Sequence, residues 1–99
     1  MKVISTENQL IEKPKHVGKL LSLGHADIMN IQLKAGEGIP AHDSKREVMI
    51  VVRKGVVMFT GDGKEYRLHD NDCLHIEPLE KHSLVAIEYT DILVFQIVA

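Results

Sequence analysis

The sequence predicts an all-β protein that folds as one small antiparallel sandwich or barrel. Short apolar segments, several of them rich in β-branched residues, recur along the chain, and turn residues separate them at intervals of about ten residues. Pro14 interrupts the only N-terminal stretch that could have been helical. A chain of 99 residues is enough for one domain and too short for two, so residues 1–99 are expected to form a single domain.

The first half of the chain contains two predicted strands. In residues 29–33, apolar and polar side chains alternate, which is the period of a strand with one face in water. A turn follows at residues 36–38, where two glycines flank a glutamate. Residues 48–52 are an apolar, mostly β-branched run that is too short for an independent helix, so they predict a strand buried on both faces.

The second half begins with a hairpin. Residues 56–60 and 64–68 are predicted strands joined by Gly61-Asp62-Gly63, because glycine supplies the positive φ that tight turns require. Another turn is expected at residues 70–72, where Asn71 is the non-glycine residue most tolerant of the left-handed region. The remaining predicted strands are apolar and bounded by turn residues: 73–76, 84–87 and 92–98.

The composition is that of an ordinary soluble globular protein, with 44% apolar and 26% charged residues. The net charge of -2 provides no general attraction to phosphate backbones or acidic membranes, so nucleic acid is not expected as a partner. The N-terminus lacks the apolar segment of a signal peptide, and no stretch approaches the length of a membrane span. We therefore expect a cytoplasmic protein without a membrane partner.

One cysteine and three histidines stand outside the motifs described below. Cys73 cannot form an internal disulfide, and its place in an apolar stretch predicts a buried, inert thiol. His16, His25 and His69 are most simply interpreted as surface residues.

From residue 33 to residue 82 the order of these signals resembles the conserved-barrel cupins, a superfamily of small antiparallel proteins. The first cupin motif contains a glycine, a His-x-His pair, a glutamate and a closing glycine; here His42 and Gly55 match, while Ser44 replaces the second histidine. His82 closes the region that corresponds to the second motif. The resemblance implies a small antiparallel β-barrel or jelly roll (double-stranded β-helix) with its site inside the barrel.

In the metal-dependent cupins that the sequence resembles, both first-motif histidines, the glutamate and the second-motif histidine bind one divalent metal. In the motif the glutamate lies six residues after the first histidine and seven before the closing glycine. Both counts, from His42 and from Gly55, reach Val48, so valine occupies the ligand position. Glu47 lies one residue earlier, and a one-residue offset in a strand turns a side chain to the opposite face. Without a β-bulge, Glu47 therefore points away from the site.

The two matched histidines, His42 and His82, are by themselves a poor permanent metal site, because protein sites for divalent metals normally supply three or four ligands. A bulge that turned Glu47 inward, or His75 on a neighbouring strand, could supply a third ligand. We interpret His75 chiefly as a core residue hydrogen-bonded to a backbone carbonyl. The sequence favours a protein without a bound cofactor and leaves a divalent metal (Mn, Fe, Ni or Zn) as the alternative.

The mouth of a small barrel can hold one small ligand with or without a metal. The predicted ligand pocket consists of five residues: His42, Ser44, Val48, Ile50 and His82. Four basic residues are candidates for its rim: Lys45, Arg46, Arg53 and Lys54. They would favour an anionic ligand, although a solvated basic surface is the simpler interpretation.

Three functions are compatible with this pattern. The first is a small-molecule-binding domain with an incomplete metal site, and the second is a metal-dependent enzyme of the dioxygenase, isomerase or decarboxylase kind that uses His42 and His82. The third is a structural dimerisation module. A homodimer is expected, because a small barrel with several short apolar strands has few ways to cover every sheet edge.

Overall fold

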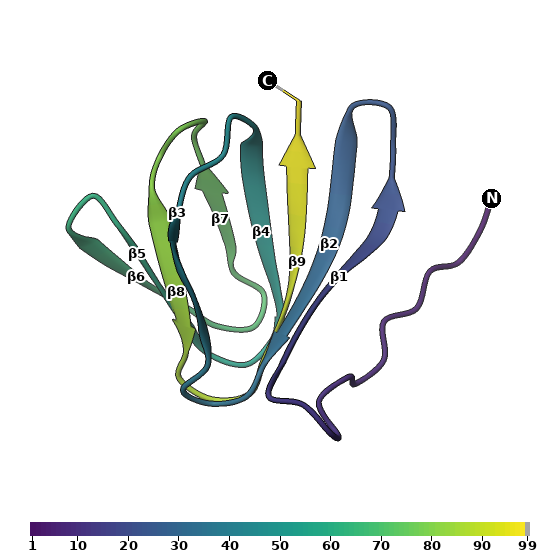
Figure 1. Ribbon diagram of the computed structural model, residues 1–99, viewed down its shortest axis with the longest axis horizontal. Coiled ribbons are helices and arrows are strands. Elements are labelled where there is room, and N and C mark those ends of the chain that lie inside the picture. The colour runs from purple at the N-terminus through teal and green to yellow at the C-terminus, as the bar shows by residue number, and fades with distance from the viewer. Residues whose placement is uncertain (99) are drawn as a thin grey trace.

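The computed structural model describes residues 1–98, which fold into two antiparallel β-sheets packed against each other (Figure 1). The described residues form nine strands: β1 (Lys15–Ser22), β2 (Ala26–Leu33), β3 (Gly38–His42), β4 (Glu47–Lys54), β5 (Val57–Gly61), β6 (Lys64–Leu68), β7 (Cys73–Ile76), β8 (His82–Ala86) and β9 (Thr90–Ile97). The all-β fold predicted from the sequence is confirmed. Within residues 1–98, no helix is long and apolar enough to cross a membrane.

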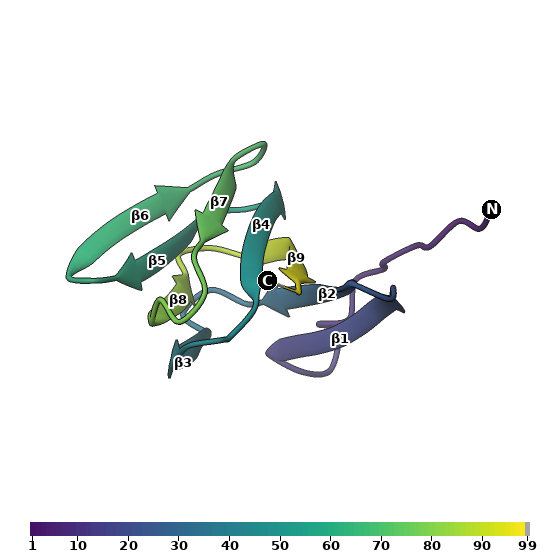
Figure 2. The same cartoon turned by 90° about the horizontal axis from the view of Figure 1, so that it is seen from above.

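Strands from distant parts of the sequence lie side by side in both sheets. The larger sheet has five strands in the order β1-β2-β9-β4-β7, and the smaller has four in the order β3-β8-β5-β6. The last strand, β9, pairs with β2 on one side and with β4 on the other, so the end of the chain lies inside the larger sheet. Seen from above, the β5–β6 hairpin projects from one end of the molecule and β1 lies at the other (Figure 2). This strand order, in which neighbours in a sheet are often distant in the sequence, is the jelly-roll pattern that the resemblance to cupins implied.

Strand β4 shows how the core is built. Val48, Ile50 and Val52 are 4%, 3% and 2% exposed, whereas Met49 and Val51 between them are half-buried. The inward direction of the first three side chains agrees with the register predicted from the sequence. The prediction that this strand is buried on both faces is wrong, because its other face lies on the outside of the larger sheet, where it is covered only in part.

The β5–β6 hairpin closes with a two-residue turn. Gly61 pairs with Lys64, and the residues between them, Asp62 and Gly63, have φ values of 51° and 72°. Two successive positive φ values are typical of a type I′ turn, whose twist matches that of the strands it joins. The predicted hairpin is therefore confirmed, with β5 shifted by one residue. Asn71, with φ 75°, also adopts the left-handed conformation predicted for it.

Two strands, β1 and β3, are absent from the sequence-based prediction. In β1 the register shifts between Lys19 and Leu21, so a bulge interrupts the alternation of side chains. Strand β3 contains Pro40 and is exposed over its last three residues. Both strands lie at sheet edges, where the apolar pattern is weak and proline is tolerated.

The segment before β1 covers part of the outer face of the larger sheet. Leu10 is 4% exposed, and the buried Gln32 side chain accepts a hydrogen bond from the Gln9 N–H at 2.9 Å. The Gln32 amide also donates to the Glu7 carbonyl oxygen at 2.7 Å. A polar side chain in the middle of the sheet is thus buried with its hydrogen bonds satisfied.

Cys73 differs from its prediction, because its thiol is exposed. Leu74 and Ile76 alternate with it on β7 and are more buried than Cys73. The apolar stretch around the cysteine is therefore a strand with one inner face, and the parity of the strand places Cys73 on the outer one.

Candidate ligand pocket

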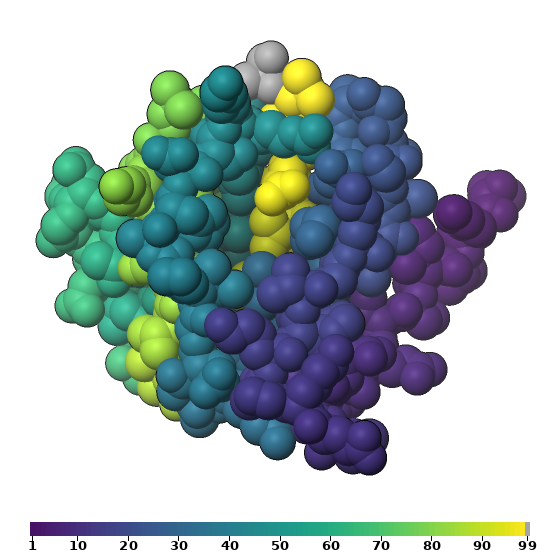
Figure 3. Space-filling model, in the orientation of Figure 1, coloured from purple at the N-terminus to yellow at the C-terminus, as the bar shows by residue number. Residues whose placement is uncertain are grey.

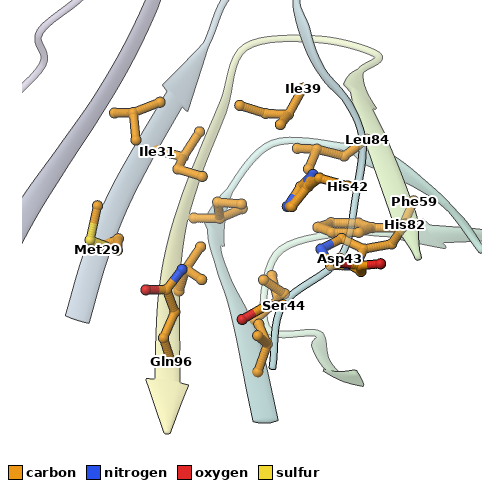
Figure 4. A pocket seen from close by; sticks show the side chains of 15 residues that line it. Met29, Ile31, Ile39, His42, Asp43, Ser44, Phe59, His82, Leu84 and Gln96 are labelled. Carbon is orange, nitrogen blue, oxygen red and sulfur yellow. The ribbon is translucent and has the colours of Figure 1, made fainter. Parts of the chain in front are cut away.

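A cavity of about 310 Å³ lies between the two sheets. Its opening is visible as a hollow between β2 and β3, with the yellow atoms of β9 at its floor (Figure 3). Met29 and Ile31 of β2 face it from the larger sheet, and Ile39 and Leu84 face it from the smaller one (Figure 4). Most of the lining is apolar, and the polar residues are His42, Asp43, Ser44, His82 and Gln96.

The five residues that the sequence predicts for a pocket all line this cavity. Val48 and Ile50 form part of the wall contributed by β4. His42 ends β3, Ser44 follows in the next loop, and His82 begins β8. The antiparallel pairing of β3 with β8 places His42 opposite His82, which brings the two histidines together.

The two histidines form a fixed polar pair in the cavity wall. Their ring centroids are 4.3 Å apart and their planes meet at 60°. Nδ1 of His42 lies 2.9 Å from the Pro40 carbonyl oxygen, and Nδ1 of His82 lies 2.9 Å from the Glu80 carbonyl oxygen. Because a carbonyl oxygen only accepts hydrogen bonds, each Nδ1 carries a proton, so the ring in its neutral form has its lone pair on Nε2. Both rings are therefore held at one nitrogen and can accept a hydrogen bond at the other.

The fold agrees with what the sequence comparison finds. The sequence pattern of the family described as "Cupin domain" matches residues 29–98, which is more than half of the chain. The chain belongs to the cupin family. No curated protein matches this cupin significantly in sequence.

Several solved structures superpose closely on this cupin. An RmlC-like cupin with a double-stranded β-helix fold from Methanocaldococcus jannaschii is 25% identical, with a TM-score of 0.83 over 98% of this chain and 90% of that chain. A conserved protein of unknown function from Streptococcus pyogenes is 19% identical, with a TM-score of 0.82 over 100% and 96%. A mutant of salicylate 1,2-dioxygenase from Pseudoaminobacter salicylatoxidans, in complex with gentisate, is 14% identical, with a TM-score of 0.80 over 85% and 25%. The last two likenesses show the fold alone.

The metal site implied by the family does not fit the cavity of this cupin. His42 and His82 offer two imidazoles, but the buried side chain at the glutamate position is Val48, and Ser44 offers a hydroxyl in place of the third imidazole. Among residues 1–98, no His, Cys, Asp or Glu joins His42 and His82 in a set whose ligand atoms all lie within 4.8 Å of one another. Two imidazoles leave most of a metal's coordination shell to water, so this donor set does not make a tight site.

Glu47 and His75, the two candidates for a third ligand, lie on the outer face of the larger sheet instead. The pairs Glu47–Ile97 and Val48–Gln96 follow one another without a shift, so no bulge turns Glu47 inward. His75 Nε2 is 2.6 Å from Glu47 Oε2, and the two side chains are 43% and 41% exposed. The interpretation of His75 as a core residue bonded to a backbone carbonyl is wrong, because the inward position on β7 belongs to Ile76.

A third side chain, Glu77, completes a cluster that the sequence did not predict. Its Oε1 lies 3.9 Å from Nδ1 of His75, on the side of the ring that faces away from Glu47. The ligand atoms of Glu47, His75 and Glu77 all lie within 4.8 Å of one another, so this set can hold a metal ion. The spacing His75-x-Glu77 was the available signal, because Glu77 directly follows β7 and residues two apart in an extended chain share a face.

The four basic residues considered for the rim lie outside the cavity lining. Arg46 Nη1 donates to Asp27 Oδ2 at 2.9 Å, and Arg53 Nη2 donates to Asp91 Oδ2 at 3.0 Å. The Ser22 hydroxyl and then Arg46 hold the pKa of Asp27 below its ordinary value. Two of the four positive charges are thus paired with carboxylates, and this group gives no support to an anionic ligand.

Three further cavity residues, Asp43, Phe59 and Gln96, were not singled out in the sequence. Phe59 is 1% exposed and lies on an inward position of β5. Gln96 continues the inward row of Ile92 and Val94 on β9, and its amide reaches the cavity from the larger sheet (Figure 4). Alternation along the two strands could have identified both residues, whereas Asp43 lies in a loop without a pattern.

Proposed function

We propose that this cupin binds a small molecule with a compact apolar body and one hydrogen-bond donor, such as a phenol or an alcohol, in the cavity between the sheets. The observation that carries the proposal is the pair of Nε2 acceptors, on His42 and His82, in a cavity whose other walls are mostly apolar. The ligand needs no metal, since the donor set of the cavity does not make a tight metal site.

The size and polarity of the cavity narrow the ligand class. A volume of about 310 Å³ is near the lower end of ordinary ligand pockets, and since a cavity of about 150 Å³ holds one benzene ring, a body of one or two rings fits here. The apolar walls, among them Ile31, Ile50 and Leu84, favour a hydrocarbon body that displaces water. A wholly apolar ligand would leave the acceptor of His82, which is 8% exposed, without a partner, and this disfavours it relative to a ligand that carries an O–H group.

Titration with phenol, toluene and benzoate at pH 8, followed by the NMR signals of the cavity methyl groups, tests this function. Phenol is expected to bind at least about tenfold more tightly than toluene, which lacks the donor, and than benzoate, whose carboxylate only accepts. In His82→Ala the phenol affinity should fall about tenfold while the toluene affinity does not fall.

The matched control is His69→Ala, an exposed histidine outside the cavity lining, which should change neither affinity. Equal affinities for phenol and toluene, or the same loss in both histidine variants, would show that the histidine pair does not select the ligand.

We also propose that the chain forms a homodimer. This is supported by apolar side chains on the outer face of the larger sheet that are only half-buried, among them Met49, Val51, Phe95 and Ile97. A second copy would remove this surface from water. Sedimentation at micromolar concentration is expected to show twice the chain mass of 11.1 kDa, and a single species at the chain mass would contradict the proposal.

A further inference from the structure

The side chains of Glu47 and His75 project from the same face of two paired strands, and Glu77 directly follows the second of them, β7. Val48 pairs with Ile76, and each of the two is 4% exposed, so the residues beside them point outward. Strand β4 is paired on both sides, with β7 and with β9, which fixes the backbone that carries Glu47. The three ligand atoms are therefore placed together by the sheet itself, within 4.8 Å of one another.

One imidazole nitrogen and two carboxylate oxygens are the donors that zinc and its neighbours in the transition series use in proteins. Magnesium and calcium prefer oxygen ligands alone, so His75 selects against them. We propose that Glu47, His75 and Glu77 form a binding site for a divalent transition-metal ion, zinc above all, separate from the cavity of the barrel. Water completes the coordination shell, because the chain supplies three ligands.

The three side chains can accept the ion by rotating, without a change in the backbone. Zinc bonds of about 2.0 to 2.1 Å to nitrogen and oxygen place neighbouring tetrahedral ligands about 3.3 Å apart. His75 Nε2 and Glu47 Oε2, now 2.6 Å apart, must separate slightly, and the Glu77 carboxylate, now nearest to Nδ1, must swing toward Nε2. Both adjustments are rotations of exposed side chains, since Glu77 is 70% exposed and His75 is 43% exposed.

Exposure also makes the cluster accessible and leaves it without a structural role. In the single chain, an ion reaches the three ligands directly from solvent, in contrast to a site inside the barrel, although the cluster borders the proposed dimer surface at Met49 and Ile97. Ion pairs between exposed side chains contribute little to folding stability, so the pairing of His75 with Glu47 is not needed to hold β4 and β7 together. Removing one of the three side chains should therefore leave the fold intact.

The test is calorimetric titration of zinc chloride into the untagged full chain, in buffer that contains excess magnesium. One zinc ion per chain is expected to bind. The affinity should fall at least tenfold in His75→Ala and in Glu47→Gln, and by a smaller factor in Glu77→Gln. The matched control is His69→Ala, which removes a histidine whose Nδ1 lies 3.6 Å from one carboxylate, Asp72 Oδ2. This variant should bind zinc as the wild type does.

Several outcomes would overturn the proposal. Unchanged zinc affinity in His75→Ala, or an equal loss in His69→Ala, would mean that zinc binds surface histidines without a defined site. A loss in His42→Ala or His82→Ala, with none in His75→Ala, would place the ion in the cavity. Thermal melting of each variant, expected to match the wild type, separates a lost ligand from a lost fold.

Discussion

Gly55→Ala is expected to destabilise the protein by several kcal/mol, which is a large part of the total stability of a small domain. Gly55 has φ 103°, a region that alanine rarely adopts. A Cβ at this position would collide with the Tyr89 carbonyl oxygen and lie 2.8 Å from the Thr90 Cα. Both obstacles are backbone atoms next to or at the start of β9, so they cannot move without disturbing the larger sheet. Chemical denaturation of the variant measures the loss.

Gly63→Ala is the matched control for this prediction. Gly63 also has a positive φ, 72°, but no atom lies within 4 Å of the position that its Cβ would occupy. The variant therefore carries the backbone strain without the collision and should lose only about 1 kcal/mol. Equal losses in Gly55→Ala and Gly63→Ala would show that the close approach of Gly55 to Tyr89 is not a constraint of the fold.

Ser44→His combined with Val48→Glu is expected to raise the metal affinity of the cavity by at least about 100-fold, because four protein ligands replace two. Ser44 and Val48 both line the cavity beside His42 and His82. Three imidazoles and one carboxylate suit manganese, iron, nickel or zinc. The experiment belongs in a His75→Ala background, so that the outer cluster does not contribute to the titration.

The double variant should also make folding depend on metal. Val48 is 4% exposed, and an unpaired carboxylate there costs several kcal/mol in the metal-free protein. The melting temperature is therefore expected to fall without metal and to recover when metal is added. Glu47→Gln should leave the metal affinity of the cavity unchanged in this background. A double variant that binds no more metal than its parent would show that Val48 does not occupy the ligand position.

The register of β4 was predictable from the sequence because two separate anchors agree on it. His42 and Gly55 lie on opposite sides of the strand, and counting from either one places Val48 at the inward position where it is found buried. The hairpin turn was predictable for a local reason, since Asp62 and Gly63 adopt the positive φ values that few other residues tolerate. In both cases the signal lies within a few residues of the feature.

What the sequence did not predict depends on pairing between distant strands. The direction of Cys73 and His75 follows from which face of β7 meets the core, and that is decided by its neighbour β4. The outer cluster needs Glu47 and His75 on adjacent strands, a pairing that no local pattern predicts. Gln96 lines the cavity because β9 lies between β2 and β4, and this strand order cannot be deduced from the residues of β9 alone.

The central claim, that the cavity binds a donor-bearing small molecule without a metal, is tested most directly by titrating phenol in the presence of EDTA while recording the nitrogen NMR signals of the histidine rings. We expect the Nε2 signals of His42 and His82 to move as phenol binds, with a dissociation constant that EDTA leaves unchanged. Phenol binding that is lost on addition of EDTA, or that moves neither ring, would contradict the claim.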